Sequence, residues 1–522
     1  MEEFSVDDPT QLLEAASEYA FYPGVKNDVS TKGFLNRFPL PVIINALQTK
    51  ADVPGLENTL VACLERIFKT KYGASLIPLY MDFVKVGLRA DSQVVRCLAC
   101  KTVTCLLENL KEESVSGVQL ISDYDVYPLL LDCVINGNEQ VSTASMDAIK
   151  TLAGFPQGKE IVFPTNSNEA THLGVLAAQC SSLGQVRVLA LIVKLFSVSS
   201  DVASLIYKSN LLTLFEEEIK NIDDTLVTMS VLELLYELSE IQHGREFLSG
   251  NTLLQLLSSI ISNKSIGSII RSRAMMISGR LLQNNYMFVD KLSFQTVISA
   301  IDRILDSEET EDTDEIEAAL EAVGQIGSSI QGAELLLLGS PPSAKHVIDA
   351  AFDRQGHGKQ LAALHALGNI SGETRTENTM MLNNNAEESL RRLIYESSSK
   401  TTKLTVSGVL LSLLRQDSEI RLGVYRLITG FVVRPWFLME ICSKQEIINT
   451  LTDGNTETVK IGMEARYKCC KAIQKALLSS GKVISDASRD AIAEKLHEFV
   501  KLGPYLTKKH EAQPMVATAD RF

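Results

Sequence analysis

One nine-residue pattern recurs along the chain and constrains its fold more than any other feature. Residues 362–370 read A-A-L-H-A-L-G-N-I, and residues 318–326, forty-four positions earlier, read A-A-L-E-A-V-G-Q-I. Small and branched residues occupy positions 1, 2, 5, 6 and 9, the spacing of a helix face that packs closely on its neighbours. Positions 4 and 8 vary freely in chemistry, and we expect both to face outward.

Looser copies of this pattern occur along most of the chain. They end at Ile67, Leu106, Leu152, Val198, Leu238, Leu281, Ile326, Ile370, Phe431 and Ile473. Successive ends lie 39 to 46 residues apart, except for an interval of 61 residues between Ile370 and Phe431. Armadillo and HEAT units recur every ~40 to 47 residues. The sequence therefore predicts an all-α chain, a right-handed α-solenoid of about ten armadillo/HEAT-like repeats with one elaborated unit before Phe431.

The repeat also suggests how the chain is divided. We expect an N-terminal cap over residues 1–37, a repeat array over 38–480, a capping helix over 481–502, and a C-terminal tail over 503–522 that is partly disordered. Terminal units of a solenoid must close its core with a polar outer face. Chain ends that are not tied down are often poorly ordered.

The N-terminus and the cysteines indicate a soluble intracellular protein. No signal-peptide pattern opens the chain, and no apolar run approaches the ~18 to 20 residues that span a bilayer. The nine cysteines lack the spacing of a disulfide framework, which favours reduced core thiols. Cys97 and Cys100 have redox-motif spacing but lie inside a repeat copy, which favours packing. We predict a cytoplasmic protein, with the nucleus as a second compartment, that does not bind membranes.

Charge is divided unevenly along the chain. The net charge is -14. Residues 389–522 carry 21 Lys and Arg against 14 Asp and Glu, whereas the preceding residues carry 29 against 50. Nucleic-acid binding would require a continuous basic surface, so we predict no nucleic-acid partner. The distribution favours a protein partner with its own uneven charge.

The acidic run at 306–317 is interpreted as a solvated loop, with a docking site for a basic segment as the alternative.

No group of residues predicts catalysis. The seven histidines are scattered, and the sequence contains no Walker loop, Gly-rich dinucleotide turn or nucleophile elbow. We therefore predict a non-enzyme with no cofactor and no metal. The Arg434-Pro435-Trp436 segment is interpreted as an anchor between repeats rather than a ligand-binding motif.

The outward stripe remains as the candidate binding surface. Positions 4 and 8 of the ten copies include Val193 and Gly430 as well as polar residues. The stripe lacks the Trp and Asn ladder of armadillo-type nuclear-import adaptors, which favours one particular folded partner; plain solvated surface is the alternative. The residues that we select as partner-binding, from the middle and late repeats, are Glu321, Gln325, His365, Asn369, Arg426 and Lys468.

Several short phrases, in this order and at these distances, resemble the proteasome non-ATPase regulatory subunit 5 family. They are Gln-His-Gly-Arg-Glu-Phe-Leu at 242–248, Arg-Pro-Trp at 434–436 and Gly-Pro-Tyr at 503–505. The similarity runs from about Asn58 to Tyr505. It implies a non-catalytic chaperone that holds the C-terminal domain of an AAA ATPase subunit of the proteasome base and leaves before the mature particle forms.

The resemblance also implies partners. These are AAA ATPase subunits of the base, with the large non-ATPase scaffold subunit as a second partner. The resemblance also implies that this chain is monomeric when it is free. The alternative is a general armadillo-repeat scaffold, such as a transport or ubiquitin-pathway adaptor.

Overall fold

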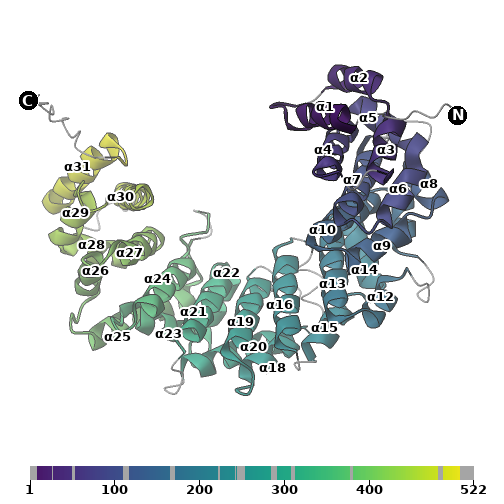
Figure 1. Cartoon of the computed structure of the whole chain (residues 1–522). Coiled ribbons are helices and arrows are strands. Elements are labelled where there is room, and N and C mark those ends of the chain that lie inside the picture. The colour runs from purple at the N-terminus through teal and green to yellow at the C-terminus, as the bar shows by residue number, and fades with distance from the viewer. Residues whose placement is uncertain are drawn as a thin grey trace, which may run out of the picture. The chain divides into compact units, whose positions relative to one another are not determined.

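The structure, a computed structural model, is helical throughout its described regular elements. This confirms the all-α prediction. It divides into two units, Met1–Phe247 and Leu248–Phe522, and within each unit the helices follow one another in chain order (Figure 1). The described residues are 9–25, 27–49, 53–109, 117–164, 171–220, 224–241, 243, 253–283, 291–306, 312–376, 380–479 and 486–505.

The first unit contains short helices between longer ones that carry the repeat pattern. The pattern-bearing helices α4, α7, α10, α13 and α16 each pack on the next in the series. The helices of this unit are α1 (Pro9–Phe21), α2 (Asp28–Arg37), α3 (Leu40–Thr49), α4 (Leu56–Phe68), α5 (Lys71–Leu76), the 3-10 helix η1 (Ile77–Tyr80), α6 (Met81–Leu88), α7 (Gln93–Asn109), α8 (Gly117–Asp123), α9 (Tyr127–Asn136), α10 (Glu139–Ala153), α11 (Pro156–Val162), α12 (Leu173–Gln179), α13 (Ser182–Phe196), α14 (Ser200–Lys208), α15 (Thr213–Lys220) and α16 (Thr225–Glu240).

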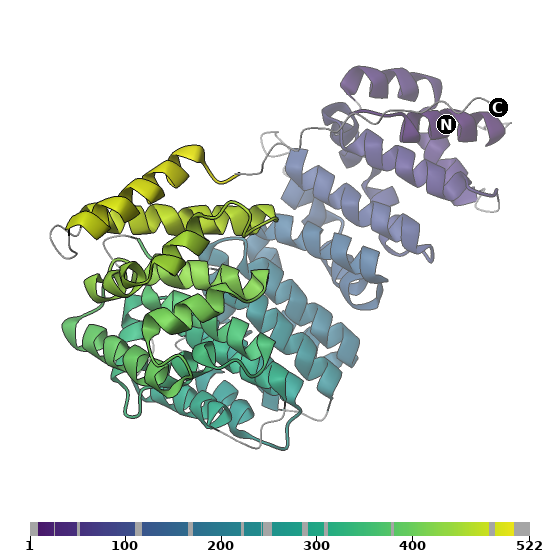
Figure 2. The ribbon, with the colours of Figure 1, turned by 90° about the vertical axis from the view of Figure 1, so that its left-hand side faces the viewer.

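The second unit repeats this arrangement. Helices α19, α21, α24, α27 and α30 carry the pattern and pack consecutively; we call them the third-helix row. Figure 2 shows the green and yellow helices of this unit stacked in chain order. The helices are α18 (Leu253–Ser262), α19 (Ser268–Leu282), α20 (Lys291–Leu305), α21 (Thr313–Gly327), α22 (Ile330–Leu338), α23 (Ala344–Phe352), α24 (His357–Ser371), α25 (Asn384–Lys400), α26 (Val406–Leu414), α27 (Ser418–Phe431), α28 (Pro435–Ser443), α29 (Gln445–Thr452), α30 (Lys460–Ser479) and α31 (Asp486–Leu502). Contacts between successive repeats are those of a solenoid, which confirms the predicted class.

Small residues of the pattern let neighbouring helices of the row approach closely. A Cβ atom placed on Gly324 of α21 would lie 2.6 Å from Cα of Ala366 on α24, and one on Gly279 of α19 would lie 2.8 Å from Cα of Ala322 on α21. Ala322 and Ala366 are buried. The helix axes can therefore approach only because these positions lack large side chains.

The prediction that positions 4 and 8 face outward is wrong at two places. Val193 is only 5% exposed, because it lies in the last turn of α13 and packs there with its buried neighbours. Gly430 is buried where α27 meets α24, and a Cβ atom there would lie 2.0 Å from Oγ of Ser371. The other predicted stripe residues are exposed or half-buried.

The acidic run at 306–317 is not a loop throughout. Residues 307–311 lie outside the described residues, but Asp312 caps α21 by accepting hydrogen bonds from the backbone N–H groups of Asp314 and Glu315. Glu315 is 2% exposed and pairs with Arg271 at 2.9 Å. The second half of the run therefore begins a helix, where acidic residues interact favourably with the helix dipole.

Most of the cysteines are core residues and carry thiols. None of the nine forms a disulfide bond, and seven of them are buried, including Cys97 and Cys100. Burial raises the pKa of Cys470 to about 12 and that of Cys442 to about 11. Thiols with raised pKa values are weak nucleophiles at neutral pH, which agrees with a packing role.

Helices α1 and α2 fall within the predicted cap and α31 within the predicted capping helix. The proposed boundaries stay predictions, and tail residues 506–522 lie outside the described residues. Within the described part of the chain, every helix is too short or too polar to cross a membrane.

Candidate functional site

The six predicted partner-binding residues lie on four successive helices of the third-helix row. Glu321 and Gln325 lie on α21, His365 and Asn369 on α24, Arg426 on α27 and Lys468 on α30. Glu321 and Lys468 are exposed, and the other four are half-buried.

Arg426 joins two of the predicted residues. Its guanidinium donates to Nδ1 of His365 at 2.7 Å and to Oδ1 of Asn369 at 3.1 Å. It also donates to Oε2 of Glu373 at 3.2 Å. A guanidinium has no acceptor atom, so Nδ1 of His365 is the unprotonated nitrogen and the neutral ring carries its proton on Nε2.

Glu373 is the residue that the sequence reasoning missed. Its carboxylate is 8% exposed and accepts hydrogen bonds from both Arg426 and Lys468. Burial raises the pKa of Glu373, but the hydrogen bond from Lys468 and the charge of Arg426 outweigh this effect, so the pKa lies below its ordinary value. We call His365, Asn369, Glu373, Arg426 and Lys468 the Glu373 network.

The end of α24 positions Glu373. Gly372 adopts a φ of +99°, a left-handed conformation that favours glycine. The N–H groups of Gly372 and Glu373 donate to the carbonyls of Asn369 and Gly368 at 3.0 and 3.1 Å, the pair of bonds of a Schellman motif. Glu373 lies four residues after Asn369, so extending the stripe by one turn beyond the nine-residue pattern would have found it.

The structure does not bring Glu321 and Gln325 into this network. Nε2 of Gln325 donates to Oε1 of Glu321 at 3.2 Å along the same helix. Within the described residues, no hydrogen bond or ion pair connects this pair to the Glu373 network. Four of the six predicted residues therefore meet at one place, and two lie apart on α21.

A groove adjoins the Glu373 network along one side of α30. It has a volume of about 690 Å³, within the range of ~300 to 1,000 Å³ typical of ligand sites. We call it the α30 groove. Its lining residues are Glu373, Met380, Thr429, Val432, Val433, Pro435, Leu438, Lys468, Lys471, Ala472, Lys475, Ala476 and Ser479.

The geometry around His365 predicts an unusual titration. Burial is the main cause, and the Arg426 charge the second, of a pKa of His365 below 6.5; Glu373 opposes both. Because the folded-state pKa is depressed, neutral His365 contributes to the free energy of unfolding above pH 6.5. This contribution is lost as the pH falls through the lowered pKa.

Replacing Arg426 by leucine should raise the pKa of His365, measured by NMR titration of the imidazole.

Two variants make this titration interpretable. His365→Gln identifies the imidazole signal by removing it. Arg392→Leu removes an exposed arginine of α25 and should leave the titration unchanged. A pKa of His365 at or above 6.5 in the unmodified protein would contradict the prediction.

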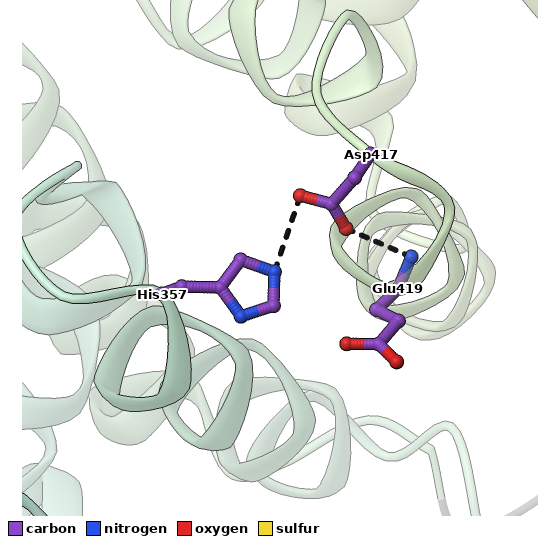
Figure 3. Close-up of side chains that lie close together, drawn as sticks. All are labelled: His357, Asp417 and Glu419. Atoms are coloured by element: carbon purple, nitrogen blue, oxygen red, sulfur yellow. Dashed lines mark hydrogen bonds and ion pairs between the residues drawn. The ribbon is translucent and has the colours of Figure 1, made fainter.

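A second cluster lies at the N-terminal ends of α24 and α27. Among the described residues, His357, Asp417 and Glu419 form a group whose potential metal-ligand atoms lie within 4.8 Å of one another. Figure 3 shows Asp417 between the other two, and its Oδ2 lies 3.1 Å from Nε2 of His357. All three side chains are exposed. Asp417 caps α27 by accepting from the N–H groups of Glu419 and Ile420, which accounts for its position without an ion.

Comparison with known proteins connects this fold to one family. The family model described as Proteasome non-ATPase 26S subunit matches residues 56–522. The mouse (Mus musculus) 26S proteasome non-ATPase regulatory subunit 5 is 20% identical over 472 residues, which cover 88% of this chain and 86% of the mouse protein. The human (Homo sapiens) protein of the same name is 20% identical over 470 residues, covering 86% of this chain and 85% of the human protein.

A solved structure supports the fold alone. The karyopherin Kap121p bound to Ste12p matches with a TM-score of 0.50 and 13% sequence identity, over 94% of this chain and 49% of the karyopherin chain. Such a low identity carries no information about partners. The family match, in contrast, covers most of the sequence and includes the whole Glu373 network and the α30 groove. The chain belongs to the Proteasome non-ATPase 26S subunit family.

Proposed function

We propose that this protein is a non-catalytic chaperone for assembly of the proteasome regulatory particle base. In this proposal it binds the C-terminal domain of an AAA ATPase subunit and is released before the mature particle forms. Family membership supports a role with the proteasome. The Glu373 network is the observation that supports this part of the protein as the binding surface. It joins three successive helices of the third-helix row beside the α30 groove.

The physical basis of chaperoning here is steric occlusion. Repeats that contact only their neighbours form an extended surface before the partner arrives, and the network holds Arg426 and Lys468 in place. A surface that is ordered in advance loses little side-chain entropy on binding. An ATPase domain held on it could not engage the proteolytic core until release, and the chaperone itself would need no nucleotide.

The large non-ATPase scaffold subunit of the base is the second partner, and the free chaperone is a monomer. It acts in the cytoplasm, with the nucleus as a second compartment. The proposal includes neither nucleic acid nor a membrane as a partner.

Changing the charges of the predicted surface should weaken capture of ATPase subunits without unfolding the protein. We choose Glu321→Lys with Lys468→Gln, because a carboxylate at position 468 would lie beside Glu373. Recovery of base ATPase subunits by a tagged copy, measured by quantitative mass spectrometry of native complexes, should fall roughly tenfold, equivalent to about 1.4 kcal/mol. Thermal stability should change little, because both replaced side chains are exposed, where charges contribute only ~0 to 1 kcal/mol, and Glu373 keeps its hydrogen bonds from Arg426.

A matched control has the same charge changes outside the site. Glu388→Lys with Lys460→Gln alters two exposed residues of the same unit and should leave recovery unchanged. ATPase subunits recovered without the proteolytic core would support an assembly intermediate. Recovery of import cargo or cytoskeletal proteins in their place would contradict the chaperone proposal, and equal recovery by both variants would exclude this surface.

A further inference from the structure

We propose that the α30 groove binds an amphipathic helix of the partner, one with an apolar stripe flanked by acidic residues. This inference rests on the proposed function, since it specifies the chemistry of the segment that the chaperone would hold. Three features of the groove lead to it: an apolar floor, a row of lysines and a length that fits a short helix.

The floor of the groove is apolar and has space above it. Val432 and Leu438 are each 1% exposed and form a fixed base, whereas Val433 remains 39% exposed. On the α30 side the lining is small, because Ala472 and Ala476 occupy one stripe of that helix. Small side chains opposite branched ones leave a hollow that apolar side chains of a partner could fill, with a gain of ~25 cal/mol per Å² of apolar surface buried.

Lysines line the α30 side of this floor. Lys468, Lys471 and Lys475 follow one another at spacings of three and four residues, so they lie along one face of the helix. All three are exposed. Lys468 is paired with Glu373, whereas within the described residues Lys471 has no ion-pair partner. Among the described lining residues three are lysines and one, Glu373, is acidic, so this part of the groove carries a positive charge that complements acidic side chains.

The groove is long enough to hold a short helix. The lining positions on α30 run from Lys468 to Ser479, and eleven steps of ~1.5 Å make about 17 Å, or roughly three helical turns. A helix in a groove places residues i, i+3, i+4 and i+7 against the floor. Its flanking carboxylates would then meet the lysines.

Glu373 gives the groove a fixed end. Its carboxylate holds Lys468, and Arg426 holds Glu373 from the other side. The first lysine of the row is therefore positioned before binding, whereas Lys471 remains exposed to reach an incoming carboxylate. Partner capture should accordingly weaken as salt is raised, since exposed charges are screened over about 10 Å at 0.1 M ionic strength.

The test uses the full-length protein and a synthetic probe. The probe is a fluorescent helical peptide of about 14 residues, roughly four turns, with leucines at i, i+3, i+4 and i+7 and glutamates on the flanks. Two comparison peptides carry lysines in place of the glutamates, or the same residues in scrambled order. Fluorescence anisotropy gives each Kd. We expect the acidic amphipathic peptide to bind at least tenfold more tightly than either comparison peptide.

Substitutions in and outside the α30 groove test whether the peptide binds there. Lys471→Glu with Lys475→Glu should raise Kd for the acidic peptide at least tenfold, and Ala472→Phe, which fills the hollow, should do the same. Lys460→Glu with Lys501→Glu makes the same change in net charge on exposed residues that do not line the groove, and Kd should change less than twofold. Circular dichroism of each variant checks that it is folded.

The outcomes separate this inference from the proposed function. Equal binding of acidic and basic peptides, no measurable binding to the unmodified protein, or a Kd that the paired lysine substitution leaves unchanged would each overturn the groove assignment. Capture of ATPase subunits that survives the lysine substitution would also overturn it, while leaving the chaperone proposal intact. Peptide binding without capture of any proteasome subunit would contradict the chaperone proposal alone.

Discussion

Replacing Arg434 by alanine should lower the free energy of unfolding of the second unit by roughly 3 to 5 kcal/mol, the cost of breaking a buried ion pair by removing one partner. Arg434 is fully buried and forms two hydrogen bonds with the carboxylate of Glu387, at 2.7 and 2.9 Å. It also donates to the carbonyls of Ser371 and Gly430 at 3.0 Å. Its loss removes the cationic partner of a largely buried carboxylate, which among the described residues keeps only the N–H of Leu382 as a donor, and it removes a donor from each of the two carbonyls.

The protein carries its own reporter for this measurement. Trp436 is the single tryptophan of the chain and lies against Tyr395, Phe431 and Phe437, with ring centroids 5.5 to 6.1 Å apart. Urea unfolding followed by its fluorescence should show the midpoint fall strongly in Arg434→Ala. Arg392→Ala breaks an exposed pair with Glu396 and should change stability by less than about 1 kcal/mol. If both variants lost a similar amount of unfolding free energy, the buried pair would contribute no more to stability than the exposed one.

Replacing Gly324 by alanine should destabilise the second unit although it adds only one methyl group. The new Cβ would lie 2.6 Å from Cα and 2.7 Å from Cβ of Ala366. The first of these atoms is backbone and cannot turn away, so α21 and α24 must separate. Overpacking of this kind costs ~1 to 3 kcal/mol, and it also weakens an interface between neighbouring repeats, on which solenoid stability depends. Urea unfolding followed by Trp436 fluorescence would measure the loss.

The same substitution at Gly368, the matching position of the pattern, should not lower the free energy of unfolding. A Cβ atom on Gly368 would lie 3.8 Å from Cβ of Arg426, an ordinary contact. In a helix interior, alanine is favoured over glycine by ~0.8 to 1.0 kcal/mol. Gly368→Ala should therefore be neutral or stabilising. If both variants changed stability equally, helix propensity rather than close packing would explain the glycines of the pattern.

The sequence alone predicted the features that depend on local periodicity. The nine-residue pattern and its spacing identified the helices of the third-helix row, because each copy must bury one face against the next. The same periodicity selected His365, Asn369, Arg426 and Lys468, which contact one another or share Glu373. The Arg434-Pro435-Trp436 segment was also correctly interpreted as an anchor, since Arg434 links three segments of the chain.

The features that were missed depend on where helices end and which residues meet in space. Glu373 lies beyond the helix, held by the Schellman motif at Gly372, and the pattern stopped before it. Glu315 belongs to an acidic run that suggested solvent, but Arg271 on α19 provides a buried partner. The α30 groove lies between the end of α27, α28 and α30, and a linear pattern carries no information about the space between helices.

The 61-residue interval between Ile370 and Phe431 does not separate the helices that carry those residues, because α24 packs directly on α27. The added length lies in the connection before α25 and in α25 itself, which has 17 residues where α22 has nine. Insertions and deletions over evolutionary time can therefore be absorbed by α25 and the connection before it while the third-helix row keeps its spacing. Relatives of different length could in this way present the same row of side chains to a shared partner.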